Sequence, residues 1–107
     1  MSVSPSSFSK QPYEQFTIDV KFTKRLAVGE TLQTSTVIAA DPDGADVTAT
    51  VISGQLISGN DIVRVGVKAG TTGNTYKLTV RATTNLTTPG TEDHRYEGDI
   101  DMIVLEQ

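Results

Sequence analysis

The sequence contains no cysteine and no tryptophan, and only 6% of its residues are aromatic. The absence of cysteine excludes a disulfide framework, thiol catalysis and cysteine-based zinc sites, and it leaves the redox compartment undetermined. Because aromatic residues are scarce, a hydrophobic core must be built mainly from Val, Ile, Leu and Ala. No stretch approaches the roughly 18 apolar residues that a membrane-spanning helix needs. The N-terminus also lacks the apolar segment of a signal peptide, so we expect a soluble protein that is not exported through a Sec-type route.

Basic residues are fewer than acidic ones: nine Lys and Arg stand against 13 Asp and Glu, which gives a net charge of −4. The only adjacent basic pair is Lys24–Arg25. Binding to the phosphates of a nucleic acid needs clustered basic side chains, so the sequence predicts no nucleic-acid partner.

The sequence also lacks the motifs of common enzymes, such as Gly-x-Ser-x-Gly, the P-loop and His-Glu-x-x-His. Its one histidine, His94, lies between Asp93 and Arg95, where we expect a solvated loop. A catalytic histidine needs a nucleophile and an orienting partner, and a zinc site without cysteine needs several histidine or carboxylate ligands. We therefore predict a protein without enzymatic activity, without a cofactor and without a catalytic metal.

Three carboxylates at Asp41, Asp43 and Asp46 have some features of a calcium-binding loop, because clustered carboxylates suit that hard cation. An EF-hand loop would need a glutamate at its twelfth position, which is occupied here by Ile52. The alternative is a turn in which the Asp side chains accept hydrogen bonds from the neighbouring backbone, and we favour this alternative. The sequence leaves open whether the loop 41–46 binds calcium.

The chain is dominated by short stretches in which apolar and polar residues alternate, the pattern of half-buried β-strands. Gly and Pro residues separate these stretches, and no helical periodicity occurs. A length of 107 residues allows one domain with one modest core. We therefore predict a single all-β domain at 16–107, an immunoglobulin-like antiparallel β-sandwich of about seven short strands. The expected strands cover 16–22, 32–39, 46–52, 56–57, 63–67, 76–82 and 96–104, with a polar loop at 84–93.

Residues 1–15 are rich in Ser, contain Pro5 and Pro12, and show no apolar periodicity. They are therefore expected to form an extended N-terminal arm. One alternative is a frayed tail, and the other is an arm that binds a neighbouring subunit through Phe8, Pro12 and Tyr13. The second alternative predicts that removing residues 1–15 leaves the thermal midpoint almost unchanged and prevents assembly.

Charged residues are unevenly placed along the predicted strands. Acidic residues crowd the C-terminal hairpin, and Asp99 and Asp101 are among them. Two consecutive predicted strands carry outward-facing basic residues, namely Arg64, Lys68, Lys77 and Arg81. If these two strands pair, as consecutive strands usually do, the basic residues form a stripe. The surface is either a solvated face or a partner-binding contact at which acidic and basic faces of neighbouring copies meet.

Several motifs lie on the predicted strands and turns between residues 16 and 105. They are Asp19-Val20-Lys21-Phe22, Gly29-Glu30-Thr31-Leu32, Val51-Ile52-Ser53-Gly54, Val63-Arg64-Val65 and the run from Gly70 to Val80. The most specific is Gly-Thr-x-Gly-x-x-Tyr-x-Leu-Thr-Val within that run, which Thr83-Thr84 follows shortly afterwards. With these motifs the chain resembles the small tail-fibre adaptor proteins of tailed bacteriophages.

The resemblance implies a structural protein of the virion, an adaptor that joins tail or neck to fibres through protein–protein contacts. Its partners would be other virion proteins, and several copies in a homo-oligomeric ring would add modest contacts together. Assembly would take place in the host cytoplasm. The chain departs from the family pattern at Lys24–Arg25, where such proteins often carry Trp, and in a longer turn at 41–47.

Two other functions remain open from the sequence. A capsid decoration (cement) protein would share the fold and the arm, and would differ by its place on the particle. An immunoglobulin-like glycan-binding or adhesion module belongs to a different class. Such modules usually stack sugars on exposed aromatic side chains, which are scarce in this chain.

Overall fold

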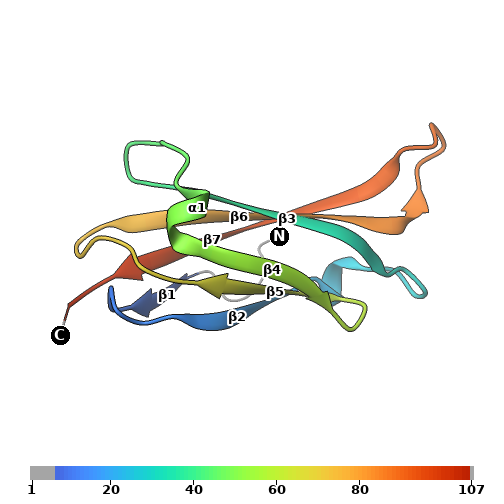
Figure 1. Ribbon diagram of the computed structural model, residues 1–107. Coiled ribbons are helices and arrows are strands. Elements are labelled where there is room, and N and C mark those ends of the chain that lie inside the picture. The colour runs from blue at the N-terminus through green and yellow to red at the C-terminus, as the bar shows by residue number, and fades with distance from the viewer. Residues whose placement is uncertain (1–6, 107) are drawn as a thin grey trace.

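Two β-sheets pack face to face in the structure of this chain, a computed structural model that describes residues 7–106 (Figure 1). One sheet has four strands in the order β1 (Ser7–Lys10), β7 (Asp93–Val104), β6 (Thr75–Thr87) and β3 (Leu32–Ala40). The other sheet has three strands in the order β2 (Phe16–Lys21), β5 (Ile62–Val67) and β4 (Ile52–Ser58). Neighbouring strands pair antiparallel, except that β1 runs parallel to β7. The predicted all-β sandwich is confirmed, and its immunoglobulin type stays a prediction.

Helical structure among residues 7–106 is limited to two short segments. One is the 3₁₀ turn η1 (Thr23–Arg25), and the other is the helical turn α1 (Thr48–Val51). Within the part of the chain that the structure describes, no helix is long and apolar enough to cross a membrane.

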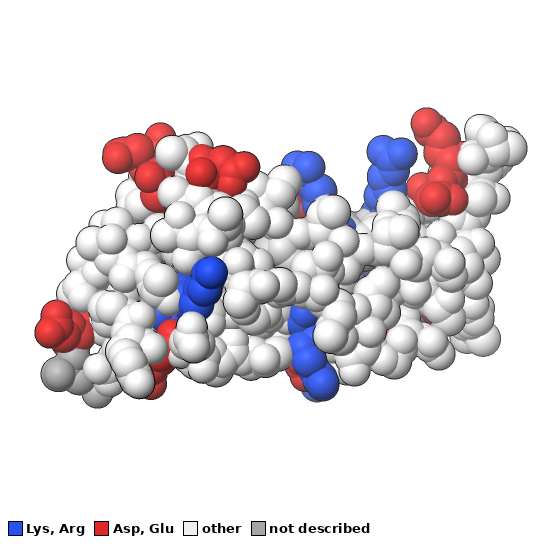
Figure 2. Space-filling model, in the orientation of Figure 1, with Lys and Arg blue, Asp and Glu red and all other residues white. Residues whose placement is uncertain are grey.

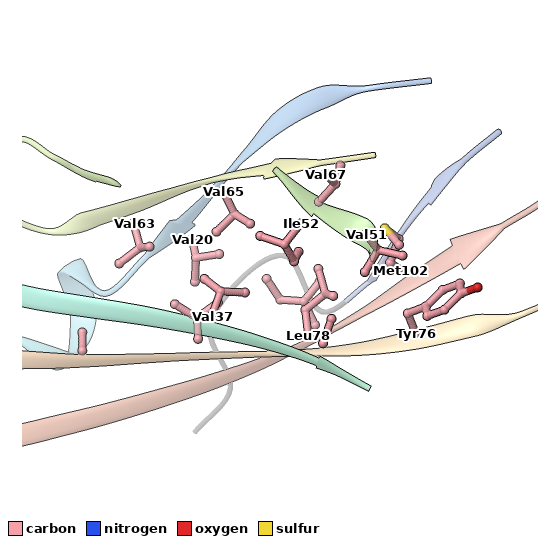
Figure 3. Packing of buried hydrophobic residues seen from close by; sticks show 14 of the residues in the cluster. Val20, Val37, Val51, Ile52, Val63, Val65, Val67, Tyr76, Leu78 and Met102 are labelled. Atoms are coloured by element: carbon pink, nitrogen blue, oxygen red, sulfur yellow. The ribbon is translucent and has the colours of Figure 1, made fainter. Parts of the chain in front are cut away.

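The core lies between the inner faces of the two sheets (Figure 3). Successive side chains of a strand point to opposite faces, so every second residue of the central strands is buried. The buried residues of β5, β6 and β7 include Val63, Val65, Val67, Tyr76, Leu78, Val80, Ala82, Ile100, Met102 and Val104. Each fully buried aliphatic side chain of this kind contributes about 1.5–3 kcal/mol relative to an exposed one. The inward-facing sets predicted for these three strands are confirmed.

The strand predicted at 46–52 is wrong over most of its length. Residues Thr48–Val51 form α1, and β4 follows directly. Asp46 starts the helical turn, because its Oδ1 accepts hydrogen bonds from the Thr48 backbone N–H at 2.9 Å and from the Thr48 hydroxyl at 2.6 Å. The Thr48 hydroxyl oxygen also accepts a hydrogen bond from the Ala39 N–H at 2.9 Å. This contact ties the turn to β3.

The hairpin of β6 and β7 is longer than predicted. The sequence predicted a polar loop at 84–93, but β6 continues to Thr87 and β7 begins at Asp93. The hairpin extends beyond the sandwich at one end of the molecule (Figure 1). Thr84, at the start of the predicted loop, is a β-branched residue that suits a pleated strand, and its side chain is buried against Glu30. Its polarity was therefore a poor guide to loop structure.

Strand β1 lies inside the segment that was expected to be an arm. Phe8 packs against the core cluster and makes an edge-on ring contact with Phe16, with the ring centroids 6.0 Å apart. Lys10, at the end of the strand, is buried. Removing residues 1–15 would remove this strand from the sheet, so the structure leads us to expect a lower thermal midpoint where the sequence led us to expect almost no change. Residues 1–6 lie outside the described residues, and a role of the arm in assembly stays a prediction.

Gly70 has no room for a side chain. Its φ angle is +99°, and a Cβ atom added to it would lie 2.8 Å from Cγ2 of Val104. Replacing Gly70 with alanine is expected to lower the free energy of unfolding by about 3 kcal/mol, through backbone strain and overpacking together. Gly44→Ala is the matched control, because Gly44 has a φ of +88° with no heavy atom within 4 Å of the added Cβ, so only the strain of about 1 kcal/mol remains. Urea denaturation measures both losses, and equal losses would contradict the clash with Val104.

Candidate partner-binding surfaces

The basic stripe expected from two consecutive strands does not form. Arg64 lies on β5 and Lys68 directly follows that strand, whereas Lys77 and Arg81 lie on β6. These strands belong to different sheets, because the loop between them crosses from one sheet to the other. Arg64 instead pairs with Asp19 of β2, with 2.9 Å between Nε and Oδ1. The role of these four basic residues in partner binding stays a prediction. They lie on two different sheets and so do not form one continuous basic stripe.

The outward-facing side of β6 and β7 carries basic and acidic residues next to each other. Nε of Arg81 lies 2.7 Å from Oε1 of Glu97, and Nζ of Lys77 lies 3.5 Å from Oδ2 of Asp99. These side chains are roughly half exposed, so each pair contributes only about 0–1 kcal/mol to stability. Figure 2 shows acidic side chains gathered toward both ends of the upper side of the molecule, with basic side chains projecting between them. We name the outward-facing side of β6 and β7 the charged face; its charged members are Lys77, Arg81, Asp93, Arg95, Glu97, Asp99 and Asp101.

A second surface lies where the linker between β1 and β2 meets the end of β5. It surrounds a hollow of about 620 Å³, which we name the N-terminal hollow. Its lining residues are Pro12, Tyr13, Glu14, Gln15, Phe16, Lys68 and Ala69. Tyr13 is 95% exposed, which is unusual for a large side chain with an apolar ring. The structure thus brings together Pro12, Tyr13 and Lys68. The sequence had suggested partner binding for Pro12 and Tyr13 as part of the arm, and for Lys68 as part of the basic stripe.

The base of the N-terminal hollow is held by a buried lysine. Nζ of Lys10 donates hydrogen bonds to the carbonyl oxygens of Gln11, at 2.6 Å, and of Ala69. Burial lowers the pKa of Lys10, and the nearby Glu14 partly offsets this effect. The linker itself closes as a turn, in which the Glu14 N–H donates to the Gln11 carbonyl at 3.1 Å. Tyr13 therefore projects from a segment whose backbone is fixed on both sides.

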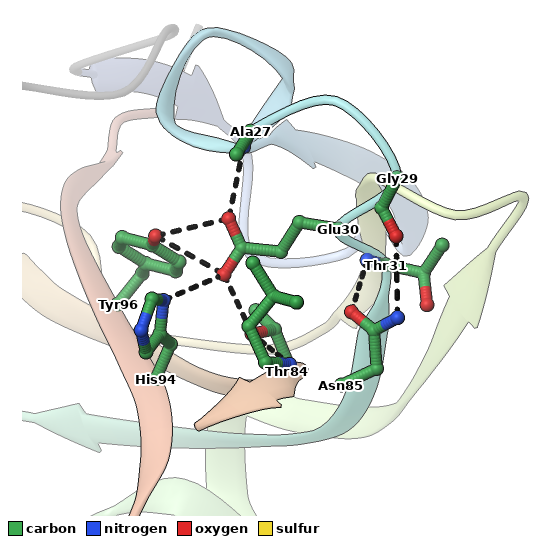
Figure 4. Close-up of polar contacts among 9 residues, drawn as sticks. Ala27, Gly29, Glu30, Thr31, Thr84, Asn85, His94 and Tyr96 are labelled. Carbon is green, nitrogen blue, oxygen red and sulfur yellow. Dashed lines mark hydrogen bonds and ion pairs between the residues drawn. The ribbon is translucent and has the colours of Figure 1, made fainter. Parts of the chain in front are cut away.

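A buried carboxylate joins the β6–β7 hairpin to the loop before β3 (Figure 4). Glu30 is only 5% exposed. Its Oε1 accepts hydrogen bonds from the Ala27 backbone N–H at 2.9 Å and from the Tyr96 hydroxyl at 3.1 Å. Its Oε2 accepts one from the Thr84 hydroxyl at 2.6 Å and lies 3.1 Å from Nδ1 of His94. These partners come from the loop, β6 and β7, so the carboxylate fixes the base of the hairpin. We name Glu30 and these partners the Glu30 network.

The Glu30 network keeps its carboxylate ionised. Burial raises the pKa of Glu30, but the hydrogen bonds from Thr84, Ala27, Tyr96 and His94 lower it more, so the pKa lies below its ordinary value of 4.5. The pKa of Tyr96 is raised by burial, by its hydrogen bond to Glu30 and by the charge of that carboxylate. The ionised carboxylate is thus paired with donors from several elements, as a buried charge must be.

A second contact holds the same loop against β6 (Figure 4). The side-chain oxygen of Asn85 accepts a hydrogen bond from the Thr31 N–H at 2.8 Å, and Nδ2 donates to the Gly29 carbonyl at 3.2 Å. The guanidinium of Arg25 lies 5.2 Å from the centroid of the Tyr96 ring, which is within the range of a cation–π contact. The hairpin base and the loop 23–31 therefore behave as one unit.

Two predictions about single sites have different outcomes. His94 was expected in a solvated loop, but it lies on β7 with its side chain only 35% exposed and in contact with Glu30. The Asp41 turn is confirmed as one capped by its own side chain, because Oδ1 of Asp41 accepts hydrogen bonds from the N–H groups of Asp43 and Ala45, both at 2.9 Å. Among residues 7–106, no group of three or more His, Cys, Asp or Glu side chains is placed to hold a metal ion.

The Glu30 network is the feature that sequence reasoning missed. Glu30 was assigned to a turn and Tyr96 to the core, and Thr84 was placed in a loop. Partners 54 to 66 residues away in the sequence meet only after the sheets have formed. One signal was present, because Glu30 and Thr84 both belong to the motifs that carry the family resemblance.

Comparison with known proteins gives one match. A protein-family model described as "Podophage GP4 fiber-tail adaptor protein gp77" matches residues 10–95. The matched range contains the N-terminal hollow and most of the Glu30 network, and it ends before Asp99 and Asp101 of the charged face. No curated protein and no solved structure matches the chain.

Proposed function

The chain belongs to the podophage fiber-tail adaptor family, and from this premise we propose that it joins the phage tail or neck to fibres through protein–protein contacts. It acts as a structural component of the virion and catalyses no reaction. The observation that carries the proposal is the family match across residues 10–95, which spans most of the sandwich. The structure supports it by providing a rigid body with exposed contact surfaces.

An adaptor must bind more than one neighbouring subunit, and two separate surfaces support this role. The N-terminal hollow is formed by the β1–β2 linker and the end of β5 in the three-stranded sheet. The charged face lies on the outer side of the four-stranded sheet. Partner-binding roles follow for Pro12, Tyr13 and Lys68 at the first surface. Several copies in a ring, assembled in the host cytoplasm, would add such modest contacts together.

Replacing Tyr13 with alanine is expected to leave the thermal midpoint within about 1 °C and to weaken binding to the virion partner at least about tenfold. The first result follows because the side chain is 95% exposed, and the second because exposed tyrosines often dominate binding energy at interfaces. Val28→Ala is the matched control, since Val28 is fully exposed in a different loop. Binding to purified fibreless tails measures the effect, and equal binding of both variants would exclude the hollow as a contact.

The proposed function is tested with particles that were assembled without this chain. Such particles are expected to lack fibres, and adding the purified protein to them is expected to restore fibre attachment. Electron microscopy counts the fibres per particle. Fibres on the deficient particles would contradict an adaptor role.

A further inference from the structure

We propose that the charged face binds the charged face of a second copy of this chain, around a two-fold axis that runs along the seam between β6 and β7. The inference deepens the proposed function and rests on it in one respect, that the chain acts through contacts between proteins. It identifies one partner as another copy and identifies the residues that select this partner.

The charges of this face nearly cancel. Its three basic residues are Lys77, Arg81 and Arg95, and its four acidic residues are Asp93, Glu97, Asp99 and Asp101. The chain as a whole carries a net charge of −4, so most of its acidic excess lies on other surfaces. The outward-facing residues of the neighbouring strand β3, which include Thr34, Thr36 and Ile38, are uncharged. Two copies therefore meet through this face with less repulsion than their net charges impose elsewhere.

The strand register makes the face self-complementary. The axis lies between the two copies and runs parallel to the strands, over the seam. Rotation by 180° about it places β6 of one copy over β7 of the other. Each residue keeps its position along the strand direction. Each residue of β6 then faces, on the second copy, the residue to which it is paired within its own chain. The facing pairs are Lys77 with Asp101, Thr79 with Asp99, Arg81 with Glu97, Thr83 with Arg95 and Thr87 with Asp93. Every charge meets an opposite charge or a hydroxyl group, which bonds to either sign.

Other two-fold arrangements of the same face bring like charges together. An axis centred on β6 sets Lys77 over Lys77 and Arg81 over Arg81, and an axis centred on β7 sets carboxylates over carboxylates. An axis perpendicular to the strands keeps β6 over β6, and when it is centred on Thr79 it sets Lys77 over Arg81. Opposed like charges are destabilising at an interface. Among these arrangements, the charge pattern favours the axis along the seam.

The dimensions of stacked sheets fit this contact. Faces pack about 10 Å apart, a distance that a Lys or Arg side chain and a carboxylate span together. Stacked sheets cross at about 30°, so the facing pairs lie closest at the centre of the face, near Thr79. Among the described residues, Asp101 has no ion pair within its own chain, so the second copy supplies its partner.

The test is sedimentation equilibrium of the full chain from about 10 μM to about 1 mM, because contacts of exposed charges are weak. The wild type is expected to dimerise, with a Kd that rises with ionic strength. Asp101→Lys places a lysine opposite Lys77 of the second copy and is expected to raise the Kd at least about tenfold. Glu97→Arg is expected to do the same, and the double variant R81E/E97R is expected to restore dimerisation because the swapped charges face each other again. Asp43→Lys makes the same change of net charge away from the face and is expected to leave the Kd within about twofold.

Two results overturn the inference: a wild type that stays monomeric at about 1 mM, or equal dissociation constants for D101K and D43K. If the wild type is monomeric and D101K loses binding to a fibre protein instead, the face has a different occupant and the inference falls. A monomeric wild type that still restores fibres to deficient particles overturns the inference and leaves the proposed function standing. A dimer that fails to restore fibres overturns the proposed function and supports the inference.

Discussion

Replacing Glu30 with alanine is expected to lower the free energy of unfolding by about 3 kcal/mol. The substitution removes the carboxylate that accepts hydrogen bonds from Ala27, Thr84 and Tyr96, and it leaves these groups without their partner at the base of the hairpin. An unpaired buried donor costs about 1–3 kcal/mol, and the cavity that remains adds to the loss. Urea denaturation followed by circular dichroism at neutral pH measures the change.

The control for this substitution is Glu92→Ala. Glu92 is an exposed glutamate near the tip of the same hairpin, and its removal is expected to change the free energy of unfolding by less than about 0.5 kcal/mol. Equal losses for the two variants would show that the Glu30 network does not stabilise the hairpin.

The same carboxylate gives the protein a defined response to acid. Because the pKa of Glu30 in the folded chain is lower than its ordinary value of 4.5, its stabilising effect is complete above that value. The effect is lost as the pH falls through the lower pKa of the folded state. Glu30→Gln, which cannot ionise, is therefore expected to show a flatter decline of stability below pH 4.5 than the wild type. Identical declines would indicate that folding does not lower the pKa of Glu30.

Deleting residues 1–10 is expected to lower the thermal midpoint by roughly 15 °C, which corresponds to about 3 kcal/mol in a domain of this size. The deletion removes β1 and exposes the edge of β7. It also removes the ring contact of Phe8 with Phe16 and the hydrogen bond from Lys10 to the Ala69 carbonyl. Differential scanning calorimetry measures the midpoint.

Deletion of residues 1–6 is the matched control, because it leaves β1 in place. It is expected to shift the midpoint by less than about 2 °C. If both deletions leave the midpoint unchanged, β1 does not contribute to the fold, and the segment is an arm as the sequence first indicated.

Most strands were predictable because burial on one face imposes a period of two on the sequence. This held for 63–67 and 76–82, where each apolar residue fills the core and each polar residue faces out. It failed at 46–52, because the hydrogen bonds of one side chain, Asp46, turn the chain into α1. It also failed at the hairpin, where residues 84–87 of β6 and 93–95 of β7 are mostly polar and show no apolar face.

The candidate surfaces were less predictable, because they depend on which strands become neighbours. Lys77 and Arg81 were correctly placed on an outward face, but Arg64 lies on the other sheet. The alternation of apolar and polar residues along a strand indicates which face of the sheet a residue occupies. It does not indicate which strand lies beside it. The N-terminal hollow likewise joins Tyr13 to Lys68, which are distant in the sequence and adjacent only through the pairing of β2 with β5.

The measurement that tests the central claim most directly is immunogold electron microscopy of purified phage particles with an antibody to this protein. Gold label is expected at the tail or neck, close to the points where fibres attach. Label confined to the capsid surface would contradict the adaptor role and indicate a decoration protein. Particles without any label would show that the chain is not an exposed component of the virion.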